Sequence, residues 1–154
     1  MDKMKAQLFD RELFVDDRGH FTNIPLQLPD FDFWGKRVYV CDNFQTGTVR
    51  GFHHHKYEAK IFICLKGGIK FVLLPEGMML TQPGSTWKPE KFTLSGNIPK
   101  ALYVPANYAN AWQTLTDDTL MIGVSNVTVE ASIEDDKRWG PMKDHPEYWE
   151  VESR

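Results

Sequence analysis

The sequence predicts an all-β fold, a jelly-roll barrel or sandwich, and three observations support this prediction. Between residues 36 and 129 the chain consists of short runs rich in β-branched and aromatic residues. Gly, Pro, Asn and Asp interrupt these runs at regular spacing. None of the runs shows the 3.6-residue periodicity of an amphipathic helix. Short strands at even intervals are typical of β-sandwiches and barrels.

The expected strands follow one another closely along the chain. They are residues 37–41, 48–55, 60–65, 69–74, 87–94, 101–104, 111–115 and 120–127. Two of the turns between them are predicted as hairpins, at Gly67-Gly68 and at Asp117-Asp118. Glycine and aspartate favour such turns because they accept the backbone angles that tight turns require.

The two ends of the chain have a different pattern. The part through Pro29 predicts one or two further strands, followed by a loop bounded by proline. The tail after Val129 is first charged and then aromatic, and we expect a short irregular or helical tail, either a helical turn or an extended arm, that closes one end of the barrel. Since the chain has no internal repeat and no low-complexity linker, residues 1–154 are expected to form one domain.

Composition and charge argue against several classes of protein. The 154 residues are 42% hydrophobic and 25% charged, as is usual for a globular domain. The net charge is −3 and neither sign is strongly clustered, so no nucleic acid is expected as a partner. No run approaches the roughly 18 apolar residues of a membrane helix, and no membrane association is expected.

The two cysteines and the N-terminal residues indicate the compartment. Cys41 and Cys64 lie in apolar runs without metal-type spacing, which fits two buried thiols better than a disulfide. The N-terminal residues 1–5 lack the apolar stretch of a signal peptide. We therefore predict a cytoplasmic protein.

A histidine cluster is the strongest candidate for chemistry. His53, His54 and His55 are three of the five histidines and lie in one expected strand. Because successive side chains of a strand point to opposite faces, His53 and His55 share one face and His54 takes the other. If the shared face lines the barrel interior, two imidazoles converge on one cavity, with Lys60 at the start of the next strand. The alternative is a solvent-facing strand end, but the strand runs into apolar sequence, which favours a buried inner face.

Seven short segments have the order and spacing of a known family. They are residues 16–21 (DDRGHF), 42–43 (DN), 49–53 (VRGFH), 60 (K), 85–87 (STW), 94–97 (LSGN) and 102–105 (LYVP). Together they resemble the dTDP-4-dehydrorhamnose 3,5-epimerase family of cupins, over roughly residues 9 to 127. The histidine segment Arg50-Gly51-x-His53-x-His55-Lys56, followed by Cys64-Leu65-x-Gly67, is more similar to the nucleotide-sugar 3,4-ketoisomerases. The chain thus combines an epimerase-like frame with a ketoisomerase-like strand.

The resemblance implies an enzyme that epimerises or isomerises a nucleoside-diphosphate-linked 4-keto sugar for surface-polysaccharide synthesis. A base with a pKa near neutrality must remove the weakly acidic hydrogen beside the C4 ketone, and His53 fits that role. Lys60 would stabilise the enolate that forms. Arg18 and Arg50 would bind the diphosphate through their forked guanidinium groups.

Further residues are expected at the same site. In the epimerases an aspartate from the C-terminal region orients the base, and Asp135 or Asp136 matches it by position. Asn43 belongs to a family segment that reaches the active site, sometimes that of the partner subunit. Tyr39 and Tyr103 alternate with apolar residues and are candidates to point inward and bind substrate. We expect a homodimer, since edge strands of small barrels commonly pair across a two-fold axis.

A metal site is the other interpretation of the histidines. The cupin metal pattern would use His53, His55 and Glu58, and Gly47 stands six residues before His53 as that pattern requires. Glu58 comes one residue too soon, however, and Asn110 stands where the last histidine is needed. We therefore expect no metal and no cofactor, and a metal-dependent cupin oxygenase is a rival function.

Two departures from the epimerases bear on the reaction. Those enzymes carry a tyrosine, used as the opposing acid, where this chain has Gly123, and a histidine where it has Asn110. Three outcomes stay open: a single-centre epimerase, a 3,4-ketoisomerase that passes a proton between adjacent carbons, and a cupin that binds sugar nucleotides without turnover. His55 is the candidate for the second acid or base.

Overall fold

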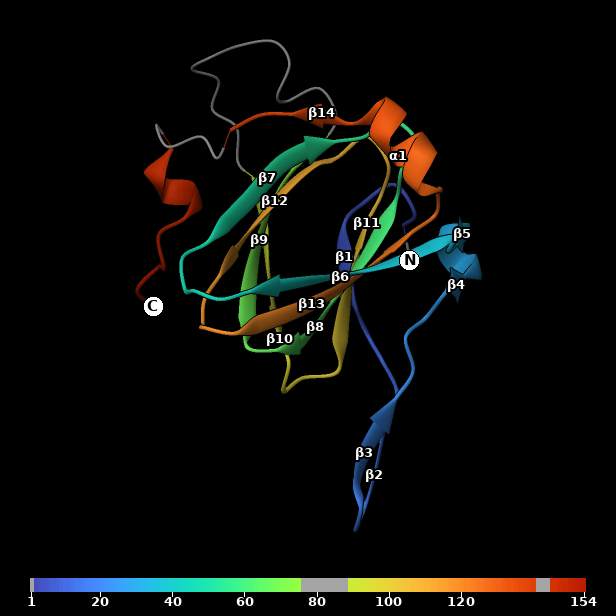
Figure 1. Cartoon of the computed structure of the whole chain (residues 1–154), viewed down its shortest axis with the longest axis vertical. Helices are drawn as coiled ribbons and strands as arrows, with labels where there is room; N and C mark the ends of the chain where they lie inside the picture. The colour runs from blue at the N-terminus through green and yellow to red at the C-terminus, as the bar shows by residue number, and fades with distance from the viewer. Residues whose placement is uncertain (1, 76–88, 141–144) are drawn as a thin grey trace.

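Two five-stranded antiparallel sheets form the body of the computed structural model, which describes residues 2–75, 89–140 and 145–154 (Figure 1). The first sheet has the order β1 (Gln7–Asp10), β11 (Lys100–Val104), β8 (Lys60–Lys66), β13 (Thr119–Ser125), β6 (Arg37–Asn43). The second has the order β10 (Glu90–Ser95), β9 (Gly68–Leu74), β12 (Ala109–Thr114), β7 (Val49–His54), β14 (Lys137–Arg138). This double-sheet arrangement confirms the predicted all-β jelly roll.

The expected strands agree with β6 to β13 within two residues at each end, with one exception. The exception is the start of β10, for which residues 87 and 88 of the expected strand lie outside the described residues. The family-like segment 85–87 lies outside them too. The short β-rich runs and the turn residues between them therefore sufficed to locate β6 to β13, apart from the start of β10.

The prediction of hairpins at Gly67-Gly68 and Asp117-Asp118 was wrong. Both turns cross from one sheet to the other, because β8 and β13 belong to the first sheet and β9 and β12 to the second. The two crossings pack against each other: the Thr116 hydroxyl accepts a hydrogen bond from the Gly68 amide at 3.1 Å. A Cβ at Gly67, where φ is +79°, would collide with Thr116, so this glycine permits the close approach of the two crossings.

The N-terminal part contains more strands than predicted. β2 (Leu13–Asp16) and β3 (Gly19–Thr22) form a hairpin that extends away from the body (Figure 1). β4 (Gln27–Leu28) and β5 (Phe33–Trp34) form a second small pair around a 3₁₀ turn at Pro29–Phe31.

The tail after Val129 is both helical and extended, so each of the two predicted forms is present. It consists of α1 (Val129–Asp135), β14 and a 3₁₀ turn at Pro146–Tyr148. The Thr128 hydroxyl caps α1 by accepting a hydrogen bond from the Ala131 amide at 3.3 Å. β14 then pairs with β7, with Arg138 opposite His53. This pairing brings the end of α1 next to the histidine cluster.

Strand alternation divides the buried side chains among three clusters. One cluster lies between the sheets, where Phe62 of the first sheet contacts Phe71 of the second with ring centroids 4.9 Å apart. A second cluster joins Ile61 and Ile63 on the outer face of the first sheet to Phe31 and Phe33. A third lies on the outer face of the second sheet, under Tyr148 of the tail. Apolar side chains thus pack on the outer face of each sheet as well as between the two sheets.

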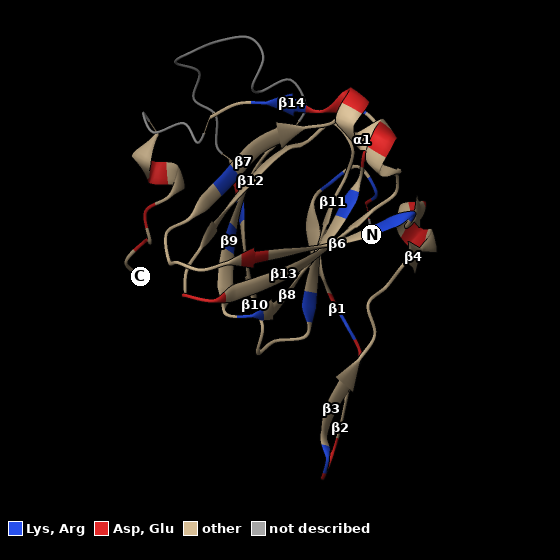
Figure 2. Cartoon of the chain, viewed as in Figure 1, with Lys and Arg blue, Asp and Glu red and all other residues tan. Residues whose placement is uncertain are grey.

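Charge is distributed over the molecule, as the sequence suggests. In the view of Figure 2, basic and acidic segments are interspersed, with the basic β14 next to the acidic residues of α1. Among the described residues no helix is long and apolar enough to span a bilayer.

Candidate active site

A cavity of about 280 Å³ lies between the two sheets, beside α1 and β14. Side chains from both sheets and from the tail line it. They include Arg37, Tyr39, Arg50, His53, His55, Lys60, Asn110, Trp112, Ser132, Asp136 and Arg138. Six of the ten residues predicted for the site therefore lie around one cavity, namely His53, His55, Lys60, Asp136, Arg50 and Tyr39.

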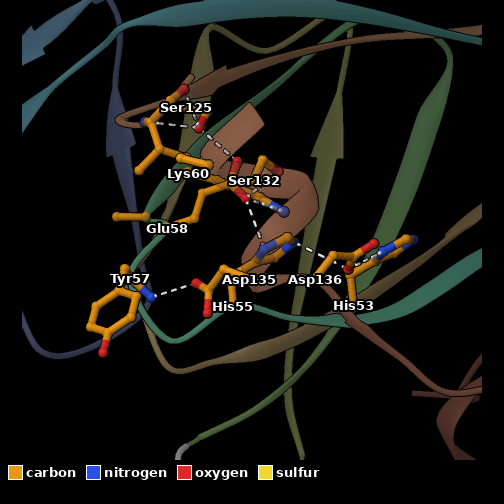
Figure 3. Close-up of polar contacts among 12 residues, drawn as sticks. His53, His55, Tyr57, Glu58, Lys60, Ser125, Ser132, Asp135 and Asp136 are labelled. Carbon is orange, nitrogen blue, oxygen red and sulfur yellow. Dashed lines mark hydrogen bonds and ion pairs between the residues drawn. The ribbon is translucent and has the colours of Figure 1, made fainter. Parts of the chain in front are cut away.

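Asp136 contacts both inward-facing histidines through one carboxylate oxygen. Its Oδ1 lies 3.1 Å from His53 Nδ1 and 3.4 Å from His55 Nε2 (Figure 3). Its Oδ2 accepts a hydrogen bond from Arg138 Nε at 2.5 Å. Burial opposes ionisation of Asp136, but the hydrogen bonds from Arg138 and His53 outweigh it and hold its pKa below the ordinary value.

The other predicted aspartate points elsewhere. Asp135 accepts a hydrogen bond from the backbone amide of Tyr57 at 2.8 Å, and so fixes the loop before β8 (Figure 3). Of the two aspartates that sequence position could not distinguish, Asp136 is thus the one in contact with His53.

His53 and His55 differ in exposure although strand alternation puts both on one side. The His53 side chain is 35% exposed, whereas that of His55 is 4% exposed. Burial, with the positive charge of Lys60, lowers the pKa of His55 to about 4. His54 points the other way, as predicted, and its Nε2 lies 3.1 Å from Asn107 Oδ1.

A fully buried carboxylate, Glu58, lies behind the histidines (Figure 3). It contacts His55 Nδ1 at 3.1 Å and Lys60 Nζ at 3.6 Å. The sequence drew attention to Glu58 only as a metal ligand at the wrong spacing. The sequence contained no signal for its role, because Glu58 lies in the short stretch between two expected strands, where a charged residue is usually exposed to solvent.

Arg50 is held at the wall of the cavity by two neighbours. Its Nε donates a hydrogen bond to Asn43 Oδ1 at 2.8 Å, and its guanidinium lies 5.8 Å from the centre of the Trp112 ring. Asn43 therefore contacts Arg50 and is not itself among the residues that line the cavity. Asn110, which replaces the family's histidine, donates a hydrogen bond to the backbone oxygen of His53 at 3.1 Å.

Tyr39 occupies the space above Gly123. The two residues are directly opposite each other in the β6–β13 pair. A Cβ built on Gly123 would lie 2.5 Å from the Tyr39 hydroxyl and closer still to its ring. The phenol of Tyr39 therefore lies where a side chain at position 123 would begin. Burial and the negative charge of Glu58 raise the pKa of this phenol.

Two predicted site residues lie away from the cavity. Arg18 is at the tip of the β2–β3 hairpin, where it is exposed and forms an ion pair with Asp16. Tyr103 lies on the outer face of the first sheet, with its ring 4.4 Å from that of Phe31. The expectation that Tyr103 points inward was wrong, because the alternation of β11 instead places its neighbour Leu102 between the sheets.

His53, His55 and Asp136 also form a group that could hold a metal ion. One ligand atom from each lies within 4.8 Å of the others. The carboxylate in this group is Asp136, whereas the sequence pointed to Glu58, whose oxygens contact an arginine, a lysine and two serines as well as His55.

A double-sheet jelly roll with polar side chains around an inter-sheet cavity is the architecture of the cupins. Residues 4–132 match the model of the family described as FdtA: WxcM-like, C-terminal. The chain belongs to this family.

Solved structures with the same fold include three sugar-nucleotide enzymes. One is the dTDP-4-dehydrorhamnose 3,5-epimerase of Bacillus anthracis, with TM-score 0.75, 24% identity, and coverage of 99% of this chain and 89% of that one. The QdtA 3,4-ketoisomerase of Thermoanaerobacterium thermosaccharolyticum has TM-score 0.71 and 21% identity over 88% of both chains. The ChmJ 3'-monoepimerase of Streptomyces bikiniensis has TM-score 0.73 and 19% identity over 93% and 72%. No curated protein matched the sequence. At these identities the structures establish the shared fold.

Proposed function

We propose that the protein epimerises or isomerises a nucleoside-diphosphate-linked 4-keto-6-deoxy sugar by base-catalysed enolisation. The observation that carries this proposal is the His53–Asp136 hydrogen bond at 3.1 Å, at the wall of a cavity that also holds Lys60 and Arg50. The family match supports it, as do fold relatives solved with TDP or with dTDP-sugars bound. Proton transfer alone completes this chemistry, so the reaction requires no redox cofactor.

His53 is the proposed base. When its Nδ1–H donates to Asp136, the lone pair of Nε2 is available to take a proton from carbon. Asp136 fixes this tautomer and stabilises the imidazolium that forms. Because the His53 side chain is one-third exposed and lines the cavity, a substrate can reach it.

Lys60 is the proposed stabiliser of the enolate. Its side chain is 9% exposed, so its charge acts through a medium of low dielectric. As the hydrogen beside the ketone leaves as a proton, negative charge develops on the ketone oxygen, and a fixed cation lowers the energy of that state.

Tyr39 is the proposed acid on the opposite side of the sugar. A phenol is protonated at neutral pH, so Tyr39 can donate a proton to the enolate, and burial raises its pKa further. The sequence suggested His55 for this role, but a neutral and nearly fully buried imidazole is a poor donor to substrate. In the epimerases the acid is a tyrosine at the position of Gly123. Here Tyr39 of β6, which lies opposite Gly123, would take its place.

Two reactions share the first step, the removal of the hydrogen beside the ketone. In a 3-epimerisation the proton returns to C3 from the other face. In a 3,4-keto shift, the enediol formed from the C4 ketone loses the proton of its C3 hydroxyl and gains one at C4, which moves the carbonyl to C3. Because the histidine segment resembles that of the ketoisomerases, the keto shift is the alternative reaction on the same class of substrate.

Deuterium exchange tests the proposal. Incubation of dTDP-4-keto-6-deoxyglucose with the protein in deuterated buffer, followed by NMR, should show deuterium in the product. A label at C3 or C5 with inversion indicates epimerisation, and a label at C4 with a C3 carbonyl indicates the keto shift. Binding of this and related keto-sugars without product or exchange would show a cupin that binds sugar nucleotides without turnover.

A metal-dependent cupin oxygenase is the second candidate, because His53, His55 and Asp136 could hold an ion. Elemental analysis of the purified protein separates the two functions. A transition metal present at one equivalent, and removed by EDTA together with activity, would replace proton transfer by metal chemistry.

We further propose a cytoplasmic homodimer that acts in surface-polysaccharide synthesis. Both cysteines are free thiols, which suits a reducing compartment. The β2–β3 hairpin extends from the body and exposes Phe14 and Phe21, an arrangement suited to contact with a second subunit. In such a dimer the exposed Arg18 of one subunit would bind the diphosphate in the cavity of the other.

A further inference from the structure

Asn110 is a polar residue of the cavity wall that the proposed reaction does not use. It lies on β12 directly opposite His53 of β7, where the register of the ladder shifts between Asn110 and Trp112. Side chains that are opposite each other across a ladder share one face of the sheet and start from Cβ atoms about 5 Å apart. Asn110 and His53 both line the cavity, so the amide lies beside the proposed base.

One hydrogen bond fixes the orientation of the Asn110 amide. Its Nδ2 donates to the backbone oxygen of His53 at 3.1 Å. A backbone carbonyl can only accept hydrogen bonds, so the end of the amide that lies against it must be the nitrogen. The amide oxygen, Oδ1, is therefore the end that is directed away from this carbonyl.

The amide oxygen is an acceptor open to the cavity. The residue is 5% exposed, and no donor among the described residues forms a hydrogen bond with Asn110 Oδ1. In the described part of the chain, the side-chain atoms that are sealed from solvent without a partner belong to other residues, namely Arg37, Asn43, His54 and His55. Oδ1 thus reaches the solvent of the cavity. Because buried polar groups are almost always hydrogen-bonded, this oxygen requires a donor from water or from a bound ligand.

The sugar ring of the proposed substrate has such a donor on one side of its ketone and not on the other. C3 carries a hydroxyl, which can donate a hydrogen bond. C5 carries the C6 methyl group and the ring oxygen, and neither has a proton to donate. An acceptor beside the base therefore fits removal of the hydrogen from C3, with the hydroxyl of the same carbon bound to Asn110 Oδ1.

We propose that Asn110 is a specificity-determining residue, which accepts a hydrogen bond from the C3 hydroxyl of the sugar and so presents the hydrogen of C3 to His53. The inference rests on the proposed function and deepens it, because it selects C3 over C5 as the reacting carbon. It holds for both reactions that begin at C3, the 3-epimerisation and the 3,4-keto shift.

Binding of unreactive ligands tests the contact without catalysis. dTDP-6-deoxyglucose has no ketone and cannot enolise, and its 3-deoxy analogue lacks the hydroxyl in question. In calorimetry, wild-type protein should bind the 3-deoxy analogue roughly three- to tenfold more weakly than the parent sugar, which is the effect of one hydrogen bond between neutral groups. The 2-deoxy analogue should bind nearly as well as the parent sugar.

Asn110→Ala removes the acceptor. This variant should bind dTDP-6-deoxyglucose and the 3-deoxy analogue with nearly equal affinity, because the C3 hydroxyl has lost its partner. Ser132→Ala is the matched control, since it removes a hydroxyl from the same cavity and leaves Asn110 intact. The control should keep the wild-type ratio of the two affinities.

Two results would overturn the contact between Asn110 and the C3 hydroxyl. One is wild-type protein that binds the 3-deoxy analogue as tightly as the parent sugar. The other is an Asn110→Ala variant that keeps the wild-type ratio of affinities. The first comparison needs no variant, so it decides the matter if Asn110→Ala does not fold.

The position of hydrogen exchange tests the choice of carbon. With dTDP-4-keto-6-deoxyglucose in deuterated buffer, the hydrogen of C3 should be lost and the hydrogen of C5 retained. Exchange at C5, with or without exchange at C3, would support an epimerase but overturn the selection of C3. Exchange at neither carbon would refute the proposed function, and the ratio of affinities would still decide whether Asn110 binds the C3 hydroxyl.

Discussion

His53 and His55 are two residues apart, face the same cavity and contact the same oxygen, yet they are suited to different tasks. His53 is exposed enough to meet a ligand and has a single carboxylate partner among the described residues. His55 lies between Asp136 and Glu58 with little access to solvent. One imidazole can therefore exchange protons with substrate, and the other supports the network behind it.

The pH dependence of stability should report the buried state of His55. Its folded pKa of about 4 lies below the ordinary 6.5, so between these values the unfolded chain binds a proton that the folded protein does not. The free energy of unfolding should therefore fall as the pH is lowered from about 6.5 to about 4. Below that window the lowered pKa values of Glu58 and Asp136 extend the loss in the same direction.

Urea unfolding of the wild type and of His55→Asn at a series of pH values measures this dependence. The variant should show a smaller slope between pH 6.5 and 4 and a similar slope below it. Equal slopes in the upper window would mean that His55 is not held neutral in the folded protein.

Sequence reasoning found both histidines because alternation along a strand is fixed by backbone geometry. It could not find their difference, since that difference depends on Glu58 from the following loop and on Lys60 from another sheet. For the same reason, the sequence could not show which of Asp135 and Asp136 contacts His53. The answer depends on the pairing of β14 with β7, and a two-residue strand such as β14 leaves no periodic signal in the sequence.

At the scale of elements, the proposed role of Tyr39 rests on the β6–β13 pair. Within β13 alone, Gly123 indicates that the tyrosine expected from the epimerases is missing. Across the ladder, Tyr39 fills the space that Gly123 leaves open, so the two positions form one unit. A cross-strand partner of this kind is decided by register, which the sequence of a single strand does not contain.

Substitutions at these two positions should therefore be strongly non-additive. Tyr39→Phe should lower kcat while leaving nucleotide affinity nearly unchanged, because it removes a proton donor from an otherwise intact pocket. Gly123→Ala should also lower kcat, by displacing the Tyr39 ring, and overpacking should cost on the order of 1–3 kcal/mol of stability.

The double variant measures the coupling between the two positions. If Gly123→Ala acts through the Tyr39 hydroxyl, Tyr39→Phe with Gly123→Ala should be little slower than Tyr39→Phe alone. Independent losses that multiply in the double variant would contradict a shared role in proton transfer.

The order of the strands along the chain was predictable, but their assignment to sheets was only partly so. Gly67 and Asp117-Asp118 indicate where the chain turns, and the structure has turns at both places. They do not indicate whether the chain returns beside the same strand. In this fold both turns lead to the opposite sheet, because the strands on either side pair with more distant partners such as β11 with β8 and β12 with β7.

On the scale of the whole molecule, the cavity is closed by segments from the chain's end, whereas one predicted ligand of the diphosphate is missing from it. α1 and β14 bring Ser132, Asp136 and Arg138 to the wall. The β2–β3 hairpin protrudes from the body (Figure 1), and Arg18 lies in the turn between its two strands, where its described ion pair is with Asp16. A single subunit therefore offers Arg50 to the diphosphate and holds Arg18 away from its own cavity.

Mixing two inactive variants tests whether Arg18 serves a second subunit. Arg18→Ala should bind the nucleotide weakly, and His53→Ala should bind it well but not turn it over. In a mixed dimer one cavity would have its own His53 together with Arg18 of the other subunit, and both would be native. Equal amounts, unfolded and refolded together, should recover about a quarter of the wild-type activity, since half of the dimers are mixed and each has one intact site. No recovery, in a mixture that light scattering shows to be dimeric, would place Arg18 outside the partner's active site.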